Sequence, residues 1–376
     1  MVILVSCVSD KPVDNEKSSI EEIYFSDYES PNEKWGFLDT TDNIIIKPIY
    51  DDVRDMIRPI IAANYKGKWG FIDHKGKEKI KFKYKQVHDF DNEMTSCIVQ
   101  TFDNEWLLID PSDKIIDSLA YDNYTANQSG YYPVSSGSSW GLIDLSGKVI
   151  IEPSCQSIKV IDDDICIAKK YDKYGVISLD QKILMPYEYD RIDPTGEGML
   201  RVKKNDKYAF YSINNYQKLS KDYDYASHME DGYFYTKNND NSYTILDRKF
   251  QKQSTIKADK IEYGGEGKWK YKENGRWGIM EVDGTQVTPP LYDLMNRYQE
   301  GYIIMSINDG WGYLDKNGEV FIPPELPLAW EFKNGYARIF HRNGVGFINK
   351  EKILVVDRRM FEVRDFYNGL ARFQTM

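Results

Sequence analysis

One short segment decides the fold of this chain: Lys68-Trp69-Gly70-Phe71-Ile72-Asp73-His74-Lys75-Gly76-Lys77. Its aromatic–glycine pair, or a degenerate form of it, recurs ten times, at intervals of 34 residues except for one of 37 and one of 35. The pairs are Trp35-Gly36, Trp69-Gly70, Trp106-Leu107, Trp140-Gly141, Tyr174-Gly175, Tyr208-Ala209, Tyr243-Thr244, Trp277-Gly278, Trp311-Gly312 and Val345-Gly346. A fixed period of this length is the signature of a tandem repeat protein.

A turn motif follows the aromatic anchor of each repeat. The fourth residue after the anchor is a polar acceptor, at Asp39, Asp73, Asp110, Asp144, Ser178, Ser212, Asp247, Glu281, Asp315 and Asn349. Three residues later, seven units carry Asp, Asn or Gly, at Asp42, Gly76, Asp113, Gly147, Asn215, Gly284 and Gly318. A side chain that hydrogen-bonds its own backbone, followed by a residue tolerant of positive φ, predicts a tight hairpin turn.

Two further columns complete the repeat. Fifteen residues after the anchor, six units carry a tyrosine: Tyr50, Tyr84, Tyr121, Tyr189, Tyr223 and Tyr292. Twenty-four residues after the anchor, seven units carry a glycine: Gly130, Gly198, Gly232, Gly267, Gly301, Gly335 and Gly369. Several spaced positions therefore recur together in one register.

The runs between these positions predict β-strands, for example Ile303–Met305, Trp311–Leu314 and Glu319–Ile322. Gly and Pro recur inside the units, and no run has helical periodicity over a helix length, which excludes helical hairpins. We therefore expect an all-β protein of ten tandem repeats of about 34 residues, each a β-hairpin or three-stranded unit. We expect prolines to end the third strand, at Pro48, Pro153, Pro186, Pro289, Pro290, Pro323 and Pro324.

A unit of this size cannot bury its own apolar face, so adjacent units are expected to stack. The tryptophan anchors are then mainly core: Trp35, Trp69, Trp106, Trp140, Trp277 and Trp311. We expect a curved open array, because ten units exceed the roughly four to eight blades of a usual propeller. Both ends also carry the same pre-anchor strand, Ile23–Phe25 and Leu370–Phe373, whereas closure by strand exchange needs complementary ends. The alternative is a propeller-like closed ring, or more than one.

The segments Lys34–Asp39 and Lys68–Lys77 resemble the WG (or KWG) repeat family of bacterial proteins, from about Ile20 to the end of the chain. The resemblance implies a β-repeat protein, often exported, with no common enzymatic activity and no catalytic residue to transfer. The units anchored at Trp106, Tyr208 and Tyr243 lack glycine after the aromatic residue. Their strand geometry is expected to differ.

The amino terminus suggests export. Leu4-Val5-Ser6-Cys7 has the form of a bacterial lipobox, although the apolar stretch before it is shorter than a secretory signal requires. We divide the chain into residues 1–19, a truncated lipoprotein signal and flexible tether, and residues 20–376, the repeat array. The predicted location is the cell envelope, with a lipid anchor on Cys7. The alternative is a cytoplasmic protein with a frayed terminus.

Residues that carry chemistry are scarce. His74, His88, His228 and His341 lie in different units outside any catalytic motif, and His228 is expected to be a solvated loop residue. Cys7, Cys97, Cys155 and Cys166 lack the spacing of a zinc site. The net charge of -10 has the wrong sign for a protein that binds a phosphate backbone. We expect no catalytic residue, cofactor, metal or nucleic acid partner.

The remaining prediction is a non-catalytic scaffold or binding surface, because stacked repeats create an extended surface. The expected partner is a protein. The alternative is a glycan or cell-wall binding module of an exported lipoprotein, suggested by the 29 tyrosines and by Lys81–Lys85, where aromatics alternate with lysines. The same alternation also predicts a half-buried strand.

Overall fold

The computed structural model describes residues 33–162, 164–341, 344–357 and 360–374. These residues form 38 strands and, within the described ranges, no helix. The strands build ten antiparallel sheets. They divide into two compact units: residues up to Phe82 together with Asp309–Gly312 and Pro323 onwards, and Lys83–Asn308 together with Tyr313–Ile322. The prediction of an all-β tandem repeat is confirmed.

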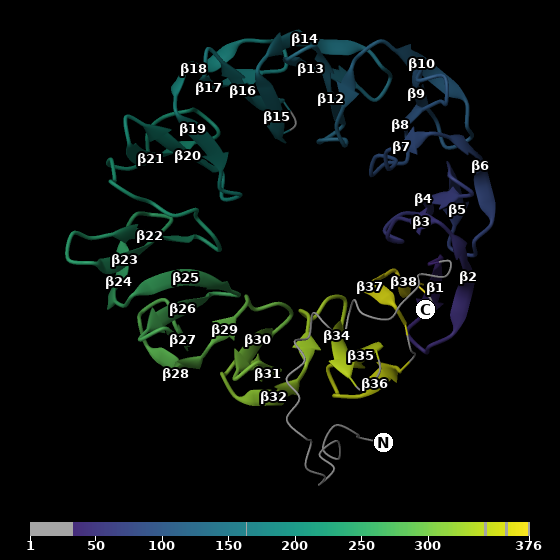
Figure 1. Ribbon diagram of the computed structural model, residues 1–376. Helices are drawn as coiled ribbons and strands as arrows, with labels where there is room; N and C mark the ends of the chain where they lie inside the picture. The colour runs from purple at the N-terminus through teal and green to yellow at the C-terminus, as the bar shows by residue number, and fades with distance from the viewer. Residues whose placement is uncertain (1–32, 163, 342–343, 358–359, 375–376) are drawn as a thin grey trace. The chain divides into compact units, whose positions relative to one another are not determined.

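Each sheet is numbered here from its first to its fourth strand (Figure 1). The first strands are β3 (Asp52–Val53), β7 (Gln86–Val87), β11 (Asn123–Tyr124), β15 (Ser157–Asp162), β19 (Arg191–Pro194), β25 (Lys260–Gly265), β29 (Leu294–Met295), β33 (Leu328–Ala329) and β37 (Glu362–Tyr367). The second strands are β4 (Ile60–Tyr65), β8 (Cys97–Gln100), β12 (Tyr131–Ser136), β16 (Ile165–Lys170), β20 (Met199–Lys204), β22 (Tyr233–Lys237), β26 (Lys268–Glu273), β30 (Tyr302–Ile307), β34 (Tyr336–His341) and β38 (Leu370–Gln374).

The third strands carry the aromatic anchors. They are β1 (Trp35–Asp39), β5 (Lys68–Asp73), β9 (Trp106–Ile109), β13 (Ser139–Asp144), β17 (Lys173–Ser178), β21 (Lys207–Ser212), β23 (Ser242–Asp247), β27 (Arg276–Met280), β31 (Gly310–Asp315) and β35 (Gly344–Asn349). The fourth strands are β2 (Ile44–Tyr50), β6 (Glu78–Tyr84), β10 (Ile115–Leu119), β14 (Val149–Cys155), β18 (Ile183–Tyr189), β24 (Lys252–Lys257), β28 (Gln286–Tyr292), β32 (Val320–Leu326) and β36 (Leu354–Val356).

The prediction of three strands per unit is wrong for most of the chain. Among the described residues, eight sheets have four strands, and only β19–β21 and β22–β24 have three. The strand that the sequence did not reveal is the first one, which in several sheets is only two residues long, as in Asp52–Val53. Two residues are too few to display the alternation by which a strand is recognised.

The predicted turn after the anchor is confirmed. In β13 to β14, the Asp144 side chain accepts the backbone N–H of Ser146 at 2.8 Å and of Lys148 at 3.0 Å. Gly147 has φ of 89°, a conformation that a residue with a Cβ adopts only with strain. The side-chain acceptor and the glycine together fix the turn between the third and fourth strands.

The glycine after the anchor is required by close packing against the fourth strand. A Cβ on Gly36 would lie 2.4 Å from the carbonyl oxygen of Ile46, and one on Gly141 would lie 2.3 Å from that of Ile151. At these positions the pairing register shifts, as between Trp140↔Cys155 and Leu142↔Ile151. The fourth strand therefore bulges toward the glycine, where a side chain would collide with it.

The prolines that were expected to end this strand instead lie inside it, so that prediction is wrong. Pro48 belongs to β2 and Pro153 to β14, each two residues before the strand ends. The nitrogen of either proline would be 2.7 Å from a Cβ on the facing glycine. A proline nitrogen carries no hydrogen, so it needs no acceptor at the bulge, and these strands stand at the edges of their sheets.

The three units without this glycine differ as the sequence predicts. Thr244 pairs in plain register with Thr255, and Leu107 pairs in the same way with Ser118. The unit with Ala209 has no fourth strand, and only isolated bridges such as Tyr208↔Tyr223 replace it. A side chain in place of the glycine is thus accompanied by loss of the bulge at that position or loss of the fourth strand.

The apolar core lies between successive sheets, as expected for stacked repeats. One cluster joins Val176, Met185 and Tyr189 of sheet β15–β18 to Leu200 and Val202 of sheet β19–β21. Of the tyrosines fifteen residues after the anchor, Tyr50, Tyr189, Tyr223 and Tyr292 belong to such clusters, and the half-buried Tyr121 packs against one. The tyrosines of this column with less than a tenth of their surface exposed are Tyr50, Tyr84, Tyr189, Tyr223 and Tyr292.

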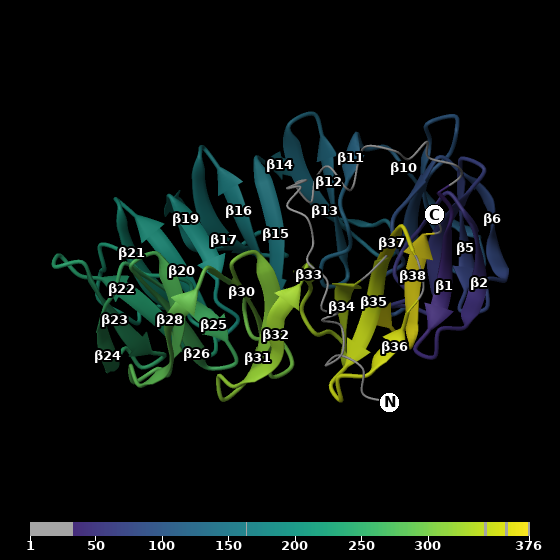
Figure 2. The same cartoon turned by 60° about the horizontal axis from the view of Figure 1, so that its bottom comes forward.

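The two ends of the array share one sheet, with strand order β2-β1-β38-β37. Trp35 of β1 pairs with Gln374 of β38, and Asp39 pairs with Leu370; Figures 1 and 2 show the two strands side by side. The expectation of an open array is therefore wrong, and the propeller-like closed alternative is correct. The ends are complementary because β37 and β38 supply the first and second strands of this sheet, and β1 and β2 supply its third and fourth. Ile23–Phe25 lies outside the described residues.

Candidate functional site

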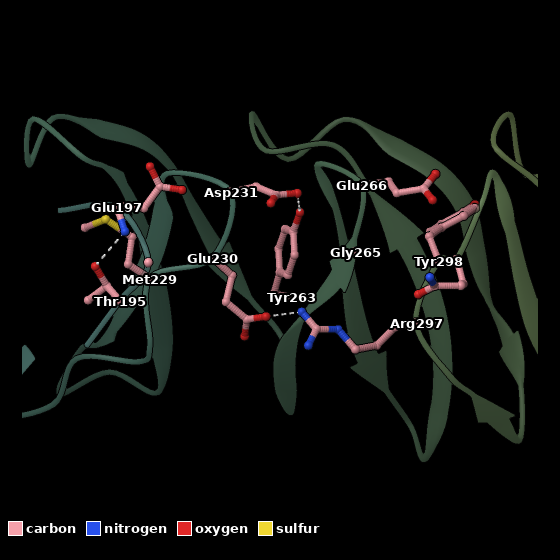
Figure 3. Close-up of a pocket in the computed structure, with 12 residues that line it drawn as sticks. Thr195, Glu197, Met229, Glu230, Asp231, Tyr263, Gly265, Glu266, Arg297 and Tyr298 are labelled. Carbon is pink, nitrogen blue, oxygen red and sulfur yellow. Dashed lines mark hydrogen bonds and ion pairs between the residues drawn. The ribbon is translucent and has the colours of Figure 1, made fainter. Parts of the chain in front are cut away.

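The candidate site is a cavity of about 550 Å³ within the second compact unit. Four loops line it, each following the first-strand position of a successive repeat (Figure 3). Its lining residues are Thr195, Gly196, Glu197, Met229, Glu230, Asp231, Tyr263, Gly265, Glu266, Arg297, Tyr298 and Gln299. Equivalent positions of four repeats thus converge on one space.

An ion pair crosses one side of the cavity. Arg297, which follows β29, pairs with the carboxylate of Glu230, 67 residues earlier. The Arg297 guanidinium also lies 5.1 Å from the centroid of the Tyr263 ring. Cations bind to aromatic faces at this distance because the ring quadrupole is negative there. The cavity wall therefore holds one guanidinium between a carboxylate and an aromatic ring.

Three further carboxylates, those of Glu197, Asp231 and Glu266, follow one another along the other side of the cavity (Figure 3). Asp231 accepts a hydrogen bond from the Tyr263 hydroxyl. Glu266 accepts the backbone N–H of Gly301 with its two oxygens, at 3.0 and 3.1 Å. Burial, together with the hydrogen bond to Asp231, holds the pKa of Tyr263 well above its usual value. The phenol therefore stays a neutral donor at physiological pH.

The carboxylates of Asp231 and Glu266 keep unused acceptor capacity, because an ionised carboxylate offers about four lone-pair sites. The Glu197 side chain makes no hydrogen bond or ion pair with any described residue. A second cavity of about 510 Å³ adjoins the first and shares Glu197 and Asp231 with it. Acidic groups therefore face a continuous recessed region of the surface.

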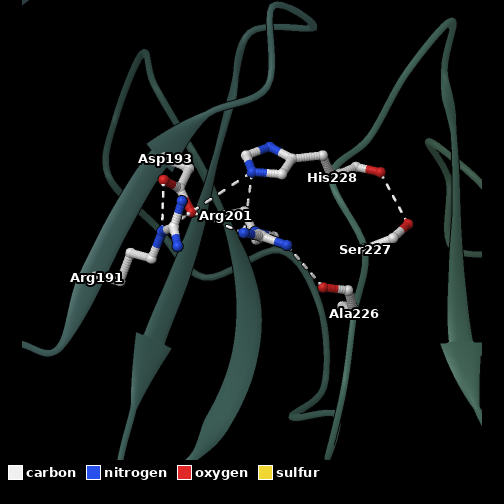
Figure 4. A network of polar contacts seen from close by, with 6 residues as sticks. All are labelled: Arg191, Asp193, Arg201, Ala226, Ser227 and His228. Carbon is white, nitrogen blue, oxygen red and sulfur yellow. Dashed lines mark hydrogen bonds and ion pairs between the residues drawn. The ribbon is translucent and has the colours of Figure 1, made fainter. Parts of the chain in front are cut away.

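A buried polar network lies beside the first cavity (Figure 4). Arg201 of β20 donates from one nitrogen to the carbonyl of Ala226 at 2.9 Å, and from the other to Asp193 at 2.8 Å. His228 Nε2 lies 3.0 Å from that second nitrogen. Burial alone would raise the pKa of Asp193, but the hydrogen bonds from Arg201 and Arg191 lower it overall. His228 contacts this network from a loop and its side chain is 44% exposed, which agrees with its prediction as a solvated loop residue.

The same linkage recurs elsewhere, which shows that it is structural. Lys270 donates to the carbonyl of Met295 at 2.9 Å, and Arg338 donates to that of Val363 at 3.0 Å. In each of these links the acceptor lies 25 residues after the donor, as Ala226 does after Arg201. A buried cation on a second strand therefore ties its sheet to the start of the next repeat.

The structure places the tryptophan anchors between core and surface. Trp35 and Trp277 are each 8% exposed, whereas Trp69, Trp106, Trp140 and Trp311 are half-buried. A cation covers several anchors: Arg372 lies 5.1 Å from the Trp35 ring and Lys270 lies 5.0 Å from the Trp277 ring. These residues are distributed along the repeats and are not brought together into a site.

Cys7 lies outside the described residues, so its lipidation stays a prediction.

Sequence reasoning missed the cavity because its chemistry is spread over four repeats. A signal was present: acidic residues precede the glycine column at Glu197, Asp231, Glu266 and Glu300.

In the described ranges, no cluster of three or more His, Cys, Asp or Glu is arranged to hold a metal ion. The described residues also contain no helix that is long and apolar enough to cross a membrane.

The model of the family described as "WG containing repeat" matches residues 35–69, 69–100, 140–174, 174–208, 277–311 and 311–344. These segments cover more than half of the chain, and the chain belongs to this family. Residues 209–276 are unmatched. They include two of the four cavity loops.

No curated protein sequence matches the chain. Among solved structures, BamB from Moraxella catarrhalis is 9% identical with a TM-score of 0.34, over 86% of this chain and 91% of that one. A eukaryotic initiation factor is 9% identical with a TM-score of 0.47, over 92% and 98%. Hsv2 from Kluyveromyces lactis is 7% identical with a TM-score of 0.34, over 71% and 97%.

Proposed function

We propose that this chain is a non-catalytic scaffold that binds a segment of a partner protein at the cavity formed by the loops after β19, before β22, at the end of β25 and after β29. The observation that supports this most directly is the convergence of four equivalent loops on a recess of about 550 Å³. Ligand sites are usually such concave regions with a few polar groups.

The position of the cavity within the repeat array supports the same proposal. Two of its loops lie in residues 209–276, where the family model has no match. The neighbouring sheets β19–β21 and β22–β24 are the three-stranded ones. A stretch that departs from the repeat pattern and also forms a recess suits a function particular to this chain.

Binding fits the lining better than catalysis does. None of the cavity-lining residues is a histidine, cysteine or serine, so the lining holds no nucleophile–base pair built on those residues. Thr195 uses its hydroxyl to donate to the carbonyl of Met199 at 3.1 Å. Glu230, Asp231 and Glu266 are engaged with groups of later repeats. These interactions position the loops, as a preorganised recognition surface requires.

The tyrosine surplus that motivated the glycan alternative has a structural explanation. Tyr50 and Tyr84 are 4% and 3% exposed, because the tyrosine column packs between sheets. Tyr84 also donates its hydroxyl to Asp113 at 2.6 Å. Such side chains offer no flat exposed platform for a sugar ring. We therefore base the proposal on the cavity and on a protein partner.

A selection of random peptides displayed on phage, against the full chain, tests this proposal. Enriched peptides should bind the wild-type chain and lose at least tenfold in affinity for Glu197→Trp, whose indole would fill the recess. Glu152→Trp on the exposed face of β14 is the matched control and should bind normally. Enrichment of peptides that bind both variants equally would place binding elsewhere and contradict the proposal.

A further inference from the structure

We infer that the ligand group held in this cavity is a cation, the guanidinium or ammonium of an arginine or lysine side chain on the partner protein. This inference rests on the proposed function and specifies its chemistry. Four carboxylates face the recess, from Glu197, Glu230, Asp231 and Glu266, against the single cation of Arg297. Arg297 is paired with Glu230, so three negative charges stay uncompensated within the lining.

The cavity itself shows how such a group is accommodated. The guanidinium of Arg297 occupies the face of Tyr263 at 5.1 Å and the carboxylate of Glu230 at the same time. A carboxylate beside an aromatic face is the combination that binds alkylguanidinium groups well, since the ring takes the flat cation and the carboxylate takes its N–H donors. The chain thus fills one such position with its own arginine.

A second position remains open on the opposite side. The Glu197 carboxylate has no partner among the described residues, although the backbone N–H of Glu197 donates to the Thr195 hydroxyl at 3.3 Å. Asp231 and Glu266 each accept N–H or O–H groups that leave lone pairs free. Met229 and Tyr298, whose side chains are buried, form part of the lining over which the methylene stem of a long side chain would lie. A single lysine or arginine side chain is small compared with about 550 Å³, so the space admits it together with adjacent peptide.

The repeat register extends this row of charges. Glu197, Asp231 and Glu266 stand at the residue before the glycine column in three successive repeats, and the adjoining cavity adds Asp247. An extended segment with several basic residues would therefore meet a carboxylate at each repeat. We expect its affinity to fall with increasing salt, because exposed charge pairs are screened.

The test compares two fluorescein-labelled peptides of alternating alanine and arginine or citrulline. Citrulline keeps the shape of arginine and lacks its charge. The full-length chain should bind the arginine peptide at least tenfold more tightly than the citrulline peptide. The double variant Glu197→Gln, Glu266→Gln should lose about tenfold or more in affinity for the arginine peptide. The matched double variant Glu152→Gln, Glu325→Gln removes the same charge from exposed fourth strands and should change little.

A third variant should act in the opposite direction, which a folding defect could not imitate. Arg297→Met would release Glu230 from its ion pair and vacate the Tyr263 face. It should tighten binding of the arginine peptide by several fold. Equal affinity for the arginine and citrulline peptides, or equal losses in the two double variants, would overturn the inference. Displacement of the peptide by calcium chloride at concentrations where sodium chloride has no effect would also overturn it, because the carboxylates would then form a divalent cation site.

The two proposals fail separately. If the phage selection yields peptides that depend on the cavity but carry no preference for arginine or lysine, the scaffold proposal stands and the cation inference fails. If no selected or designed peptide is sensitive to Glu197→Trp, both fail.

Discussion

Sheets β11–β14 and β22–β24 differ in the residue that follows the anchor, and the pairing of their fourth strands differs at that position. Gly141 follows the anchor in the first sheet, and the fourth strand bulges to within contact of its backbone. Thr244 occupies the same place in the second, and the fourth strand runs past in plain register. One Cβ thus decides how many residues of the fourth strand lie opposite this position: three where glycine follows the anchor, and one where threonine does.

The two kinds of sheet also differ in how well the family model matches them and in their distance from the cavity. Glycine-bearing sheets repeat their contacts closely enough for the family model to match them. The sheets without the glycine around residues 209–276 instead border the cavity. The candidate binding site therefore lies beside one of the stretches that depart from the repeat; the unit with Leu107 is another.

The largest effect is expected from the anchor of a glycine-bearing sheet. Trp277 is 8% exposed and packs with Ile279, Tyr292 and Met305. Trp277→Ala should lower the free energy of unfolding by about 3–5 kcal/mol, the range for a large aromatic deletion in a core. Tyr208→Ala, in a three-stranded sheet where the ring is half-buried, should cost less. Chemical denaturation measures both. Tyr171→Ala is the control, since this side chain is 89% exposed and should change stability little.

The next effect concerns the buried cation that links sheet β19–β21 to the following repeat. Arg201 and Asp193 have side chains that are 8% and 15% exposed. Arg201→Met should destabilise the chain by about 3 kcal/mol, because it leaves the Ala226 carbonyl without its donor and the largely buried Asp193 carboxylate with only the more exposed Arg191. Arg191→Met removes the more exposed partner of the same carboxylate and should cost under about 1 kcal/mol. Equal losses of unfolding free energy in the two variants would show that Arg191 and Arg201 contribute equally to the network and that Arg201 has no special role.

A smaller effect should follow from the glycine itself. Gly141→Ala introduces a Cβ that meets backbone atoms of β14, and we expect a loss of about 2 kcal/mol from the resulting strain. Ala209→Gly, in the sheet that lacks a fourth strand, should cost no more than about 1 kcal/mol. Gly130→Ala is the control for positive φ alone, because nothing lies within 4 Å of its Cβ. If Gly141→Ala were no worse than Gly130→Ala, close packing against β14 would not explain the glycine.

The smallest effect is a pH dependence confined to the network. Burial and the adjacent Arg201 guanidinium hold the pKa of His228 below its usual value of 6.5. The folded chain therefore binds this proton less readily than the unfolded chain does. The contribution of His228 to stability is unimpaired above that value and declines as the pH falls below it.

The variant His228→Gln isolates this titration. Between pH of about 7.5 and about 5.5, the unfolding free energy of the wild-type chain should decrease relative to that of His228→Gln. Urea denaturation at both pH values gives the comparison, with His74→Gln as a matched control at an exposed turn. A constant difference between wild type and His228→Gln across this range would contradict the prediction.

The sequence by itself determined the features that depend on neighbours in the chain. The period, the hairpin turn after Asp144 and the all-β character follow from local rules on turn residues and strand alternation, and they reappear in the structure. The glycine after the anchor was visible too, as was the irregularity of the units with Leu107, Ala209 and Thr244. The sequence showed the position at which glycine recurs, but it did not show that the fourth strand packs against that position.

Tertiary structure decided what depends on contacts between repeats. The pairing of Trp35 with Gln374, the place of Pro153 inside a bulge and the cavity around Glu197 all join residues whose relation no local pattern records. Each repeat resembles the next in sequence, so the residues of one repeat do not show whether the edge of β38 faces solvent or pairs with β1. Hydrogen bonding answers that question, because β38 and β1 each have an open edge until they pair with one another.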